Sequence, residues 1–162
     1  MNRPRLLLAE DDEALASLLE EYLLEAEYEV VVHRRGDTAL EALKQEHFDL
    51  VLSDIVMPGV DGLTLLQHVH NGADDTLVIL MTGYSGIENA LHAVEQGAYD
   101  FVSKPFQLPE IRVRVDNANR YQQLLRKWND IFGEEVKFDE VSPKPRLAAV
   151  KAYGQNVNGG NY

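Results

Sequence analysis

The fold is decided by one stretch, Leu50-Val51-Leu52-Ser53-Asp54-Ile55-Val56-Met57-Pro58-Gly59, in which an apolar run ends at an aspartate. The apolar part is typical of a buried strand, and the Pro-Gly pair is typical of the turn that stops one. In an open parallel sheet, ligands bind outside the carboxyl ends of the strands. Asp54 would stand at such an end. Taken alone, it is equally well explained as an aspartate that starts a turn, so the rest of the chain has to decide.

Length and composition indicate one domain with an appendage. The chain has 162 residues, of which 45% are hydrophobic, and it has no cysteine, which excludes a disulfide framework, thiol catalysis and a cysteine-based zinc site. Its net charge of −12 would repel nucleic acid, so we expect no direct nucleic acid binding. The first apolar run, Leu6–Ala9, is too short for a signal peptide or a membrane span. We therefore expect a cytoplasmic protein without membrane contact.

Apolar runs of strand length alternate with segments of helical periodicity five times along the chain. The expected strands lie at residues 5–9, 28–33, 48–53, 77–81 and 98–102. The expected helices cover roughly residues 15–23, 36–43, 63–69, 87–96 and 108–132. This order predicts a flavodoxin-like, doubly wound α/β fold with a five-stranded parallel sheet of strand order 2-1-3-4-5. It also predicts an extended C-terminal helix and a short tail.

Chemically useful side chains follow four of the five expected strands. They are Glu10 and Asp11 after the first strand, Asp54 after the third, Thr82 after the fourth and Lys104 after the fifth. The predicted strand order brings these strand ends together at one crevice. Carboxylates suit Mg²⁺, an aspartate can accept a phosphoryl group, and a lysine can neutralise the charge of the transfer. Singly, the threonine and the lysine are better explained as ordinary strand-end and surface residues, but their convergence favours a site.

Four segments resemble the receiver domain of a two-component response regulator, and their spacing is closest to the nitrogen-regulation class. The segments are Leu6–Asp12, Ser53–Gly62, Ile79–Gly83 and Gly97–Phe106. The resemblance covers about residues 3–125 of the chain. It implies a domain that is activated by phosphorylation, accepts a phosphoryl group from a sensor histidine kinase or a phosphotransfer protein, and acts on a downstream protein. Beyond its own phosphotransfer and dephosphorylation, such a domain is not an enzyme.

The resemblance also implies a role for each residue of the crevice. Asp54 would be the phosphorylated residue, and Thr82 and Lys104 would bind the phosphoryl oxygens. Mg²⁺ would be held directly by Asp11, through water by Glu10, and also by Asp54 and the backbone carbonyl of Val56. We choose Glu10 and Asp11 over the neighbouring Asp12 from their register relative to Asp54. Thr82 and Phe101 would form the switch that changes the surface of the fourth helix, fifth strand and fifth helix.

Two positions are expected to tune the lifetime of the phosphorylated state. Val56 lies two residues after the acceptor, and Tyr84 lies two residues after Thr82. Both would flank the path of a hydrolytic water, and neither side chain orients water well. The sequence therefore predicts slow autodephosphorylation.

The expected last helix is longer than a domain of this size needs. Its surplus apolar residues, Tyr121, Leu125, Trp128 and Phe132, could form a dimer seam or fold back on the same domain, and we favour the homodimer because these residues need cover. We divide the chain into a receiver domain at 1–125 and a helix extension with a C-terminal tail of unassigned role at 126–162.

Three interpretations remain open from the sequence. The first is a stand-alone receiver that acts through protein contacts or a phosphorelay. The second is the receiver part of a longer transcription regulator. The third is a Mg²⁺-dependent phosphatase with similar crevice chemistry, which is disfavoured because Val56 stands where a second acid would be needed.

Overall fold

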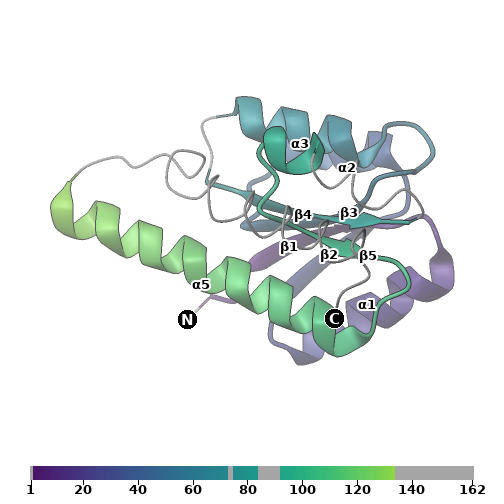
Figure 1. The fold of residues 1–162 in the computed structure, drawn as a ribbon, viewed down its shortest axis with the longest axis horizontal. Helices are drawn as coiled ribbons and strands as arrows, with labels where there is room; N and C mark the ends of the chain where they lie inside the picture. The colour runs from purple at the N-terminus through teal and green to yellow at the C-terminus, as the bar shows by residue number, and fades with distance from the viewer. Residues whose placement is uncertain (1, 73–74, 84–91, 134–162) are drawn as a thin grey trace, which may run out of the picture.

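The computed structural model describes residues 2–72, 75–83 and 92–133. Five parallel strands form one sheet in the order β2-β1-β3-β4-β5 (Figure 1). The strands are β1 (Arg5–Ala9), β2 (Glu29–His33), β3 (Leu50–Asp54), β4 (Leu77–Thr82) and β5 (Asp100–Ser103). The predicted fold and strand order are confirmed. The strand boundaries shift slightly, because β3 and β5 begin two residues later than the apolar runs do.

Helices cover both faces of the sheet (Figure 1). They are α1 (Glu13–Glu25), α2 (Gly36–Gln45), α3 (Gly62–Asn71) and α5 (Leu108–Phe132). Residues 92–95 are also helical, which agrees with the predicted fourth helix, while residues 84–91 lie outside the described part of the chain. Among the described residues, no helix is both long enough and apolar enough to cross a membrane.

Alternate residues of the strands pack into two separate hydrophobic cores, one on each face of the sheet. Leu6 and Leu8 of β1 pack with α1 and α5, whereas Leu7 and Ala9 pack with α2 and α3. Strands that are buried on both faces have continuous apolar sequences, and for this reason β1, β3 and β4 could be predicted from the sequence. The two cores hold the carboxyl ends of the strands rigidly in one row, and this row positions the candidate site.

The long helix α5 is clamped to the amino ends of two strands. The buried Gln122 side chain donates hydrogen bonds to the backbone carbonyls of Asp49 and Asp75, both at 2.8 Å. Arg126 adds ion pairs to the carboxylates of Asp49 at 3.0 Å and Asp75 at 2.5 Å. The helix is therefore anchored to the domain as far as Arg126.

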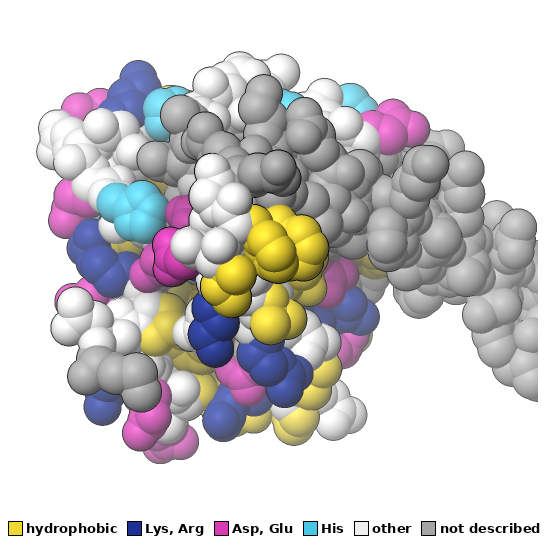
Figure 2. Space-filling model, turned by 90° about the vertical axis from the view of Figure 1, so that its left-hand side faces the viewer, with side chains coloured by type: hydrophobic (Ala, Val, Ile, Leu, Met, Phe, Trp, Pro, Cys, Tyr) yellow, Lys and Arg dark blue, Asp and Glu magenta, His cyan; other side chains and the backbone are white. Residues whose placement is uncertain are grey.

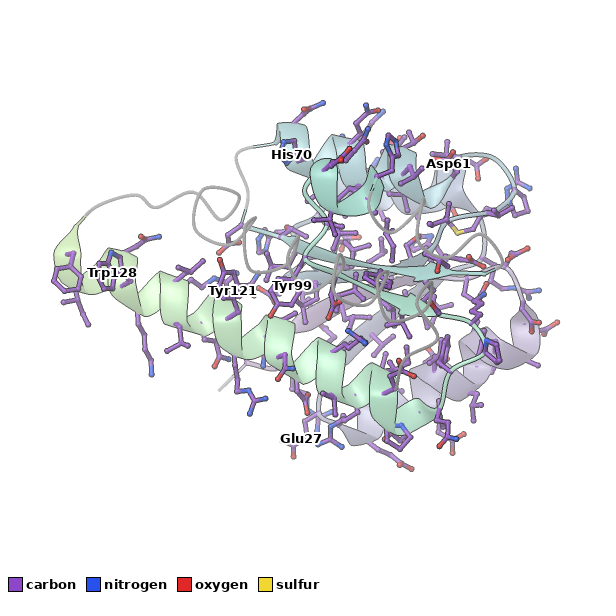
Figure 3. The ribbon with its side chains drawn as sticks, in the orientation of Figure 1. Glu27, Asp61, His70, Tyr99, Tyr121 and Trp128 are labelled. Atoms are coloured by element: carbon purple, nitrogen blue, oxygen red, sulfur yellow. The ribbon has the colours of Figure 1, made fainter. Side chains whose placement is uncertain are left out.

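The predicted surplus of apolar residues on α5 divides into two parts. Leu125 is buried and Tyr121 packs against the core, with its ring 5.3 Å from that of Tyr99 (Figure 3). These two residues belong to the domain itself. Trp128 and Phe132 are exposed, and their tilted rings contact each other with centroids 4.3 Å apart. Figure 2 shows hydrophobic side chains gathered at the end of the molecule that α5 reaches.

Candidate functional site

The residues singled out at the strand ends meet at the carboxyl edge of the sheet. Asp54 and Thr82 are the last residues of β3 and β4, while Glu10 and Lys104 directly follow β1 and β5. β3 and β4 are buried along their whole length and β1 from Leu6 onward, so the polar side chains at the strand ends gather in one crevice. The structure thus brings together side chains from four strands that are distant in sequence.

Lys104 bridges two carboxylates at the centre of this site. Its ammonium nitrogen lies 2.5 Å from Oε1 of Glu10 and 2.7 Å from Oδ2 of Asp54. Its backbone N–H donates to the carbonyl of Thr82 at 2.6 Å, and its peptide bond to Pro105 is cis. Backbone and side chain together aim the ammonium group into the crevice.

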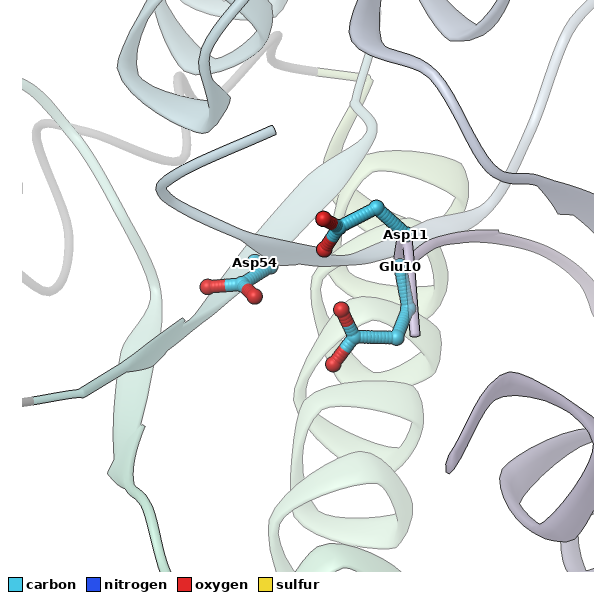
Figure 4. Close-up of side chains that lie close together, drawn as sticks. All are labelled: Glu10, Asp11 and Asp54. Carbon is cyan, nitrogen blue, oxygen red and sulfur yellow. The ribbon is translucent and has the colours of Figure 1, made fainter. Parts of the chain in front are cut away.

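The carboxylates of Glu10, Asp11 and Asp54 lie close together (Figure 4). One oxygen from each of Glu10, Asp11 and Asp54 lies within 4.8 Å of the others. Glu10 and Asp54 are buried, whereas Asp11 is exposed and has no ion-pair partner among the described residues. Hard oxygen ligands around an open position fit Mg²⁺, which usually takes one or two carboxylates and keeps several waters.

The environment that Glu10 and Lys104 share shifts the pKa of both side chains. Burial raises the pKa of Glu10 to about 7, and the negative charge of Asp54 adds to this, while the hydrogen bond from Lys104 opposes it. Burial acts to lower the pKa of Lys104, but its hydrogen bonds to Asp54 and Glu10 outweigh that effect and raise it. The lysine therefore stays charged, and the crevice disfavours a further uncompensated negative charge.

Thr82 presents a buried hydroxyl to the site edge. The residue is 1% exposed, and its Oγ1 has no hydrogen-bond partner in the part of the chain that the structure describes. A buried polar group without a partner costs free energy, commonly about 1–3 kcal/mol. A ligand oxygen that reached this hydroxyl would recover that cost.

Asp12 has a different task from its two acidic neighbours. Its side chain accepts a hydrogen bond from the backbone N–H of Leu15 at 3.0 Å and so caps the first turn of α1. Its own backbone N–H lies 3.5 Å from a carboxylate oxygen of Glu10. The geometry leaves Glu10 and Asp11, rather than Asp12, beside Asp54.

The structure describes two of the three remaining sequence-predicted positions, Val56 and Phe101. Val56 follows β3 with its side chain 77% exposed, and Tyr84 lies outside the described residues. Phe101 is buried in β5, and its backbone N–H donates a hydrogen bond to Oδ1 of Asp100 at 2.8 Å. Gly62 was not predicted to have a role of its own, yet an added Cβ there would lie 2.2 Å from the carbonyl oxygen of Asp54. Glycine directly after Asp61, the side-chain cap of α3, was the available signal.

Comparison with known proteins gives a consistent picture. A family model described as the response regulator receiver domain matches residues 6–116. The chain is 34% identical over 150 residues to the DNA-binding transcriptional regulator NtrC of Klebsiella pneumoniae, covering 87% of this chain and 32% of NtrC. It is 41% identical over 117 residues to the response regulator protein FleR of Pseudomonas aeruginosa, covering 72% of this chain and 24% of FleR. The chain thus spans about a third or less of these relatives.

Solved structures agree with the sequence relatives. The signal receiver domain of a putative Luxo repressor protein from Vibrio parahaemolyticus superposes with a TM-score of 0.73 at 25% identity, covering 82% of this chain and 99% of that domain. NtrX from Brucella abortus gives a TM-score of 0.74 at 28% identity, covering 85% of this chain and 31% of NtrX. These similarities give no support to the phosphatase interpretation.

Proposed function

Because this chain belongs to the family of response regulator receiver domains, we propose that it accepts a phosphoryl group on Asp54 from the histidine of a sensor kinase or a phosphotransfer protein. The observation that carries the proposal is the placement of Asp54 between a lysine and an acidic pair, with Lys104 at 2.7 Å. Transfer of a phosphoryl group depends mainly on positioning and charge neutralisation, and these groups supply both.

The residues of the crevice have separate tasks in this reaction. Lys104 contacts Oδ2 of Asp54, which leaves Oδ1 to form the new P–O bond as the P–N bond to the donor histidine breaks. The ammonium group then pairs with the phosphoryl oxygens instead of the free carboxylate. Thr82 supplies the second contact, because its unpartnered hydroxyl can donate to a phosphoryl oxygen.

Mg²⁺ would be held by Asp11 and Asp54, by the backbone carbonyl of Val56 and, through water, by Glu10. When bound, the ion supplies charge neutralisation for the incoming phosphoryl group. Asp11 is the residue best suited to direct coordination, because it is exposed and free of the lysine that already pairs with Glu10.

The signal would leave the site through Thr82 and Phe101. A phosphoryl group draws the Thr82 hydroxyl toward Asp54, and the space that opens lets the buried Phe101 ring turn further inward. The surface formed by the fourth helix, β5 and α5 would then change for a downstream protein target. This is a population shift between two states that the phosphoryl contacts bias.

The exposed end of α5 supports a homodimer through the C-terminal helix. Leu124, Trp128, Ile131 and Phe132 are all exposed large hydrophobic residues on its last three turns. Burying such residues against a second copy would stabilise an assembly by about 25 cal/mol per Å² of apolar surface. We assign residues 1–125 to the receiver and 126–162 to this extension and its tail.

The cellular setting belongs to the proposal as well. We propose a cytoplasmic protein that works through protein contacts, either alone or as the receiver part of a longer transcription regulator. The names of the relatives include DNA-binding regulators, so the absence of nucleic acid binding stays a prediction for this chain.

Phosphorylation by a small donor tests the proposed function. We expect phosphoramidate with Mg²⁺ to add one phosphoryl group, detected by intact-mass spectrometry, and Asp54→Asn or excess EDTA to prevent the addition. The matched control is Asp12→Asn, which keeps the helix cap because asparagine caps as well as aspartate does. Equal phosphorylation of wild type and Asp54→Asn would refute the assignment of the acceptor.

A further inference from the structure

The loop between β3 and α3, residues 55–61, carries the Val56 carbonyl that we propose as a metal ligand. The Val56 side chain is 77% exposed, and Pro58 and Gly59 are exposed too. Ile55 is buried and Met57 and Val60 pack against the core, whereas the exposed tip of the loop at Pro58 and Gly59 is left to backbone contacts. A Mg²⁺ ligand needs firm positioning, because the ion requires near-ideal octahedral geometry with oxygens at about 2.0–2.1 Å.

One backbone contact to this loop comes from the first turn of α2. The N–H of Gly36 donates to the carbonyl of Pro58 at 2.9 Å. An added Cβ on Gly36 would lie 1.5 Å from the carbonyl oxygen of Val60 and 2.5 Å from its carbonyl carbon. The obstructing atoms are backbone and cannot rotate away. Only glycine lets α2 approach the loop this closely.

A second contact braces the same loop through Gly59. This residue has φ +86°, and an added Cβ on it would lie 2.7 Å from the carboxyl carbon of Asp37. The Asp37 carboxylate is held in turn by Arg35, at 2.9 and 3.2 Å, and by the N–H of Thr38 at 3.0 Å. The first turn of α2 thus meets three consecutive loop residues, 58–60.

The far end of the loop is fixed to the strand that carries the acceptor. The N–H of Gly62 donates to the carbonyl of Ile55 at 2.7 Å, and its missing Cβ leaves room for the carbonyl of Asp54. We propose that the first turn of α2 is a buttress that holds the Val56 carbonyl at the metal site, with Gly36 as its positioning residue. This inference rests on the proposed Mg²⁺-dependent function.

Gly36→Ala is the direct test of the buttress. The new Cβ and the Val60 oxygen must separate by a further 1.5 Å to reach 3.0 Å, so the loop has to shift. We expect the dissociation constant for Mg²⁺, measured by isothermal titration calorimetry on the full chain, to rise about tenfold or more. The Mg²⁺ concentration that half-saturates phosphorylation by phosphoramidate should rise equally, while the rate at saturating Mg²⁺ stays within about twofold of wild type.

The control is Ala39→Gly, which weakens the same helix without adding an atom against the loop. Ala39 is fully buried in the core beneath α2, so the change should lower the melting temperature. Its Mg²⁺ affinity should stay at the wild-type value. The buttress is refuted if Gly36→Ala binds Mg²⁺ like wild type, or if Ala39→Gly weakens binding as much as Gly36→Ala does.

A second variant keeps the proposal testable if Gly36→Ala does not fold. Gly59→Ala pushes against the Asp37 side chain, which can partly yield, so we expect a smaller rise of about threefold in the dissociation constant. Unchanged affinity in this variant would also refute the buttress. Absence of Mg²⁺ binding in the wild type would refute the proposed function itself, whereas normal binding by wild type and Gly36→Ala alike would refute the buttress alone.

Discussion

Replacing Glu10 by glutamine should stabilise the metal-free protein, and more so at high pH. The Glu10 side chain is 0% exposed, and burial raises its pKa from 4.5 to about 7. The charge of Asp54 adds to the rise, and the hydrogen bond from Lys104 opposes it. The folded chain therefore binds this proton more tightly than the unfolded chain does.

The sign and size of the effect follow from linkage between protonation and folding. Since the unfolded state releases the proton first, the metal-free wild type loses stability as pH rises from 4.5 to about 7, and the loss is complete above that range. These two pKa values correspond to a cost of about 1 kcal/mol at pH 5 and about 3 kcal/mol at pH 8. Glutamine does not ionise, so the variant should avoid a cost that grows by about 2 kcal/mol between the two pH values.

Urea unfolding followed by circular dichroism, in EDTA at pH 5 and pH 8, measures this difference. We expect the stability advantage of Glu10→Gln over wild type to grow by about 2 kcal/mol from the lower to the higher pH. The control is Glu13→Gln, whose side chain is 77% exposed and whose effect should change by less than about 0.5 kcal/mol. Parallel pH profiles for Glu10→Gln and wild type would refute the reasoning.

Three further predictions address lifetime, anchoring and assembly. Val56→Asn should speed loss of the phosphoryl group about fivefold, because an amide can orient the hydrolytic water with one hydrogen bond. The decay of the phosphoryl signal in ³¹P NMR measures this rate. If neither Val56→Asn nor Tyr84→Ala accelerates the decay, the prediction of slow autodephosphorylation is wrong. Arg126→Ala should cost about 1 kcal/mol in urea unfolding: burial acts to raise the pKa of Asp75, but the partly exposed Arg126 guanidinium, together with His47, outweighs burial and lowers it. The stability from this pair is lost as pH falls through the Asp75 titration, so the variant and wild type should converge at low pH. Trp128→Ser should shift the light-scattering mass toward the monomer at a given concentration, and an unchanged mass would contradict the seam at the end of α5.

The fold and most of the site could be predicted from the sequence, because both depend on where the strands end. A strand buried on both faces shows as an apolar run, and the first polar residue after it marks the edge of the sheet. With the predicted strand order, Asp54 and Lys104 could be placed at the same edge, because each directly follows the first polar residue after its apolar run, Ser53 or Ser103. The distances between them could not, since they depend on side-chain geometry that no periodicity records.

Residues whose role depends on a neighbour distant in sequence were missed. The sequence predicted only that a helix starts at Gly36. No residue close to Gly36 in the sequence indicates that a Cβ there would lie 1.5 Å from the carbonyl oxygen of Val60. On α5 the periodicity marked Tyr121 as one of the surplus apolar residues, yet Gln122 beside it is fully buried. This glutamine lies in the core because its side-chain amide donates to the carbonyls of Asp49 and Asp75, just before β3 and β4.

The balance of charge in the crevice determines the order of events in the proposed reaction. Three carboxylates face one ammonium group, so the fully ionised site has an excess of two negative charges. Two like charges 4.8 Å apart repel by about 3.5 kcal/mol at an effective dielectric constant of 20, and a phosphoryl group brings about −2 more. Lys104 cannot neutralise both the acids and the phosphoryl oxygens, because it already bridges Glu10 and Asp54. We therefore expect a divalent cation to bind before the phosphoryl group, because neutralising the carboxylates would free Lys104 for the phosphoryl oxygens.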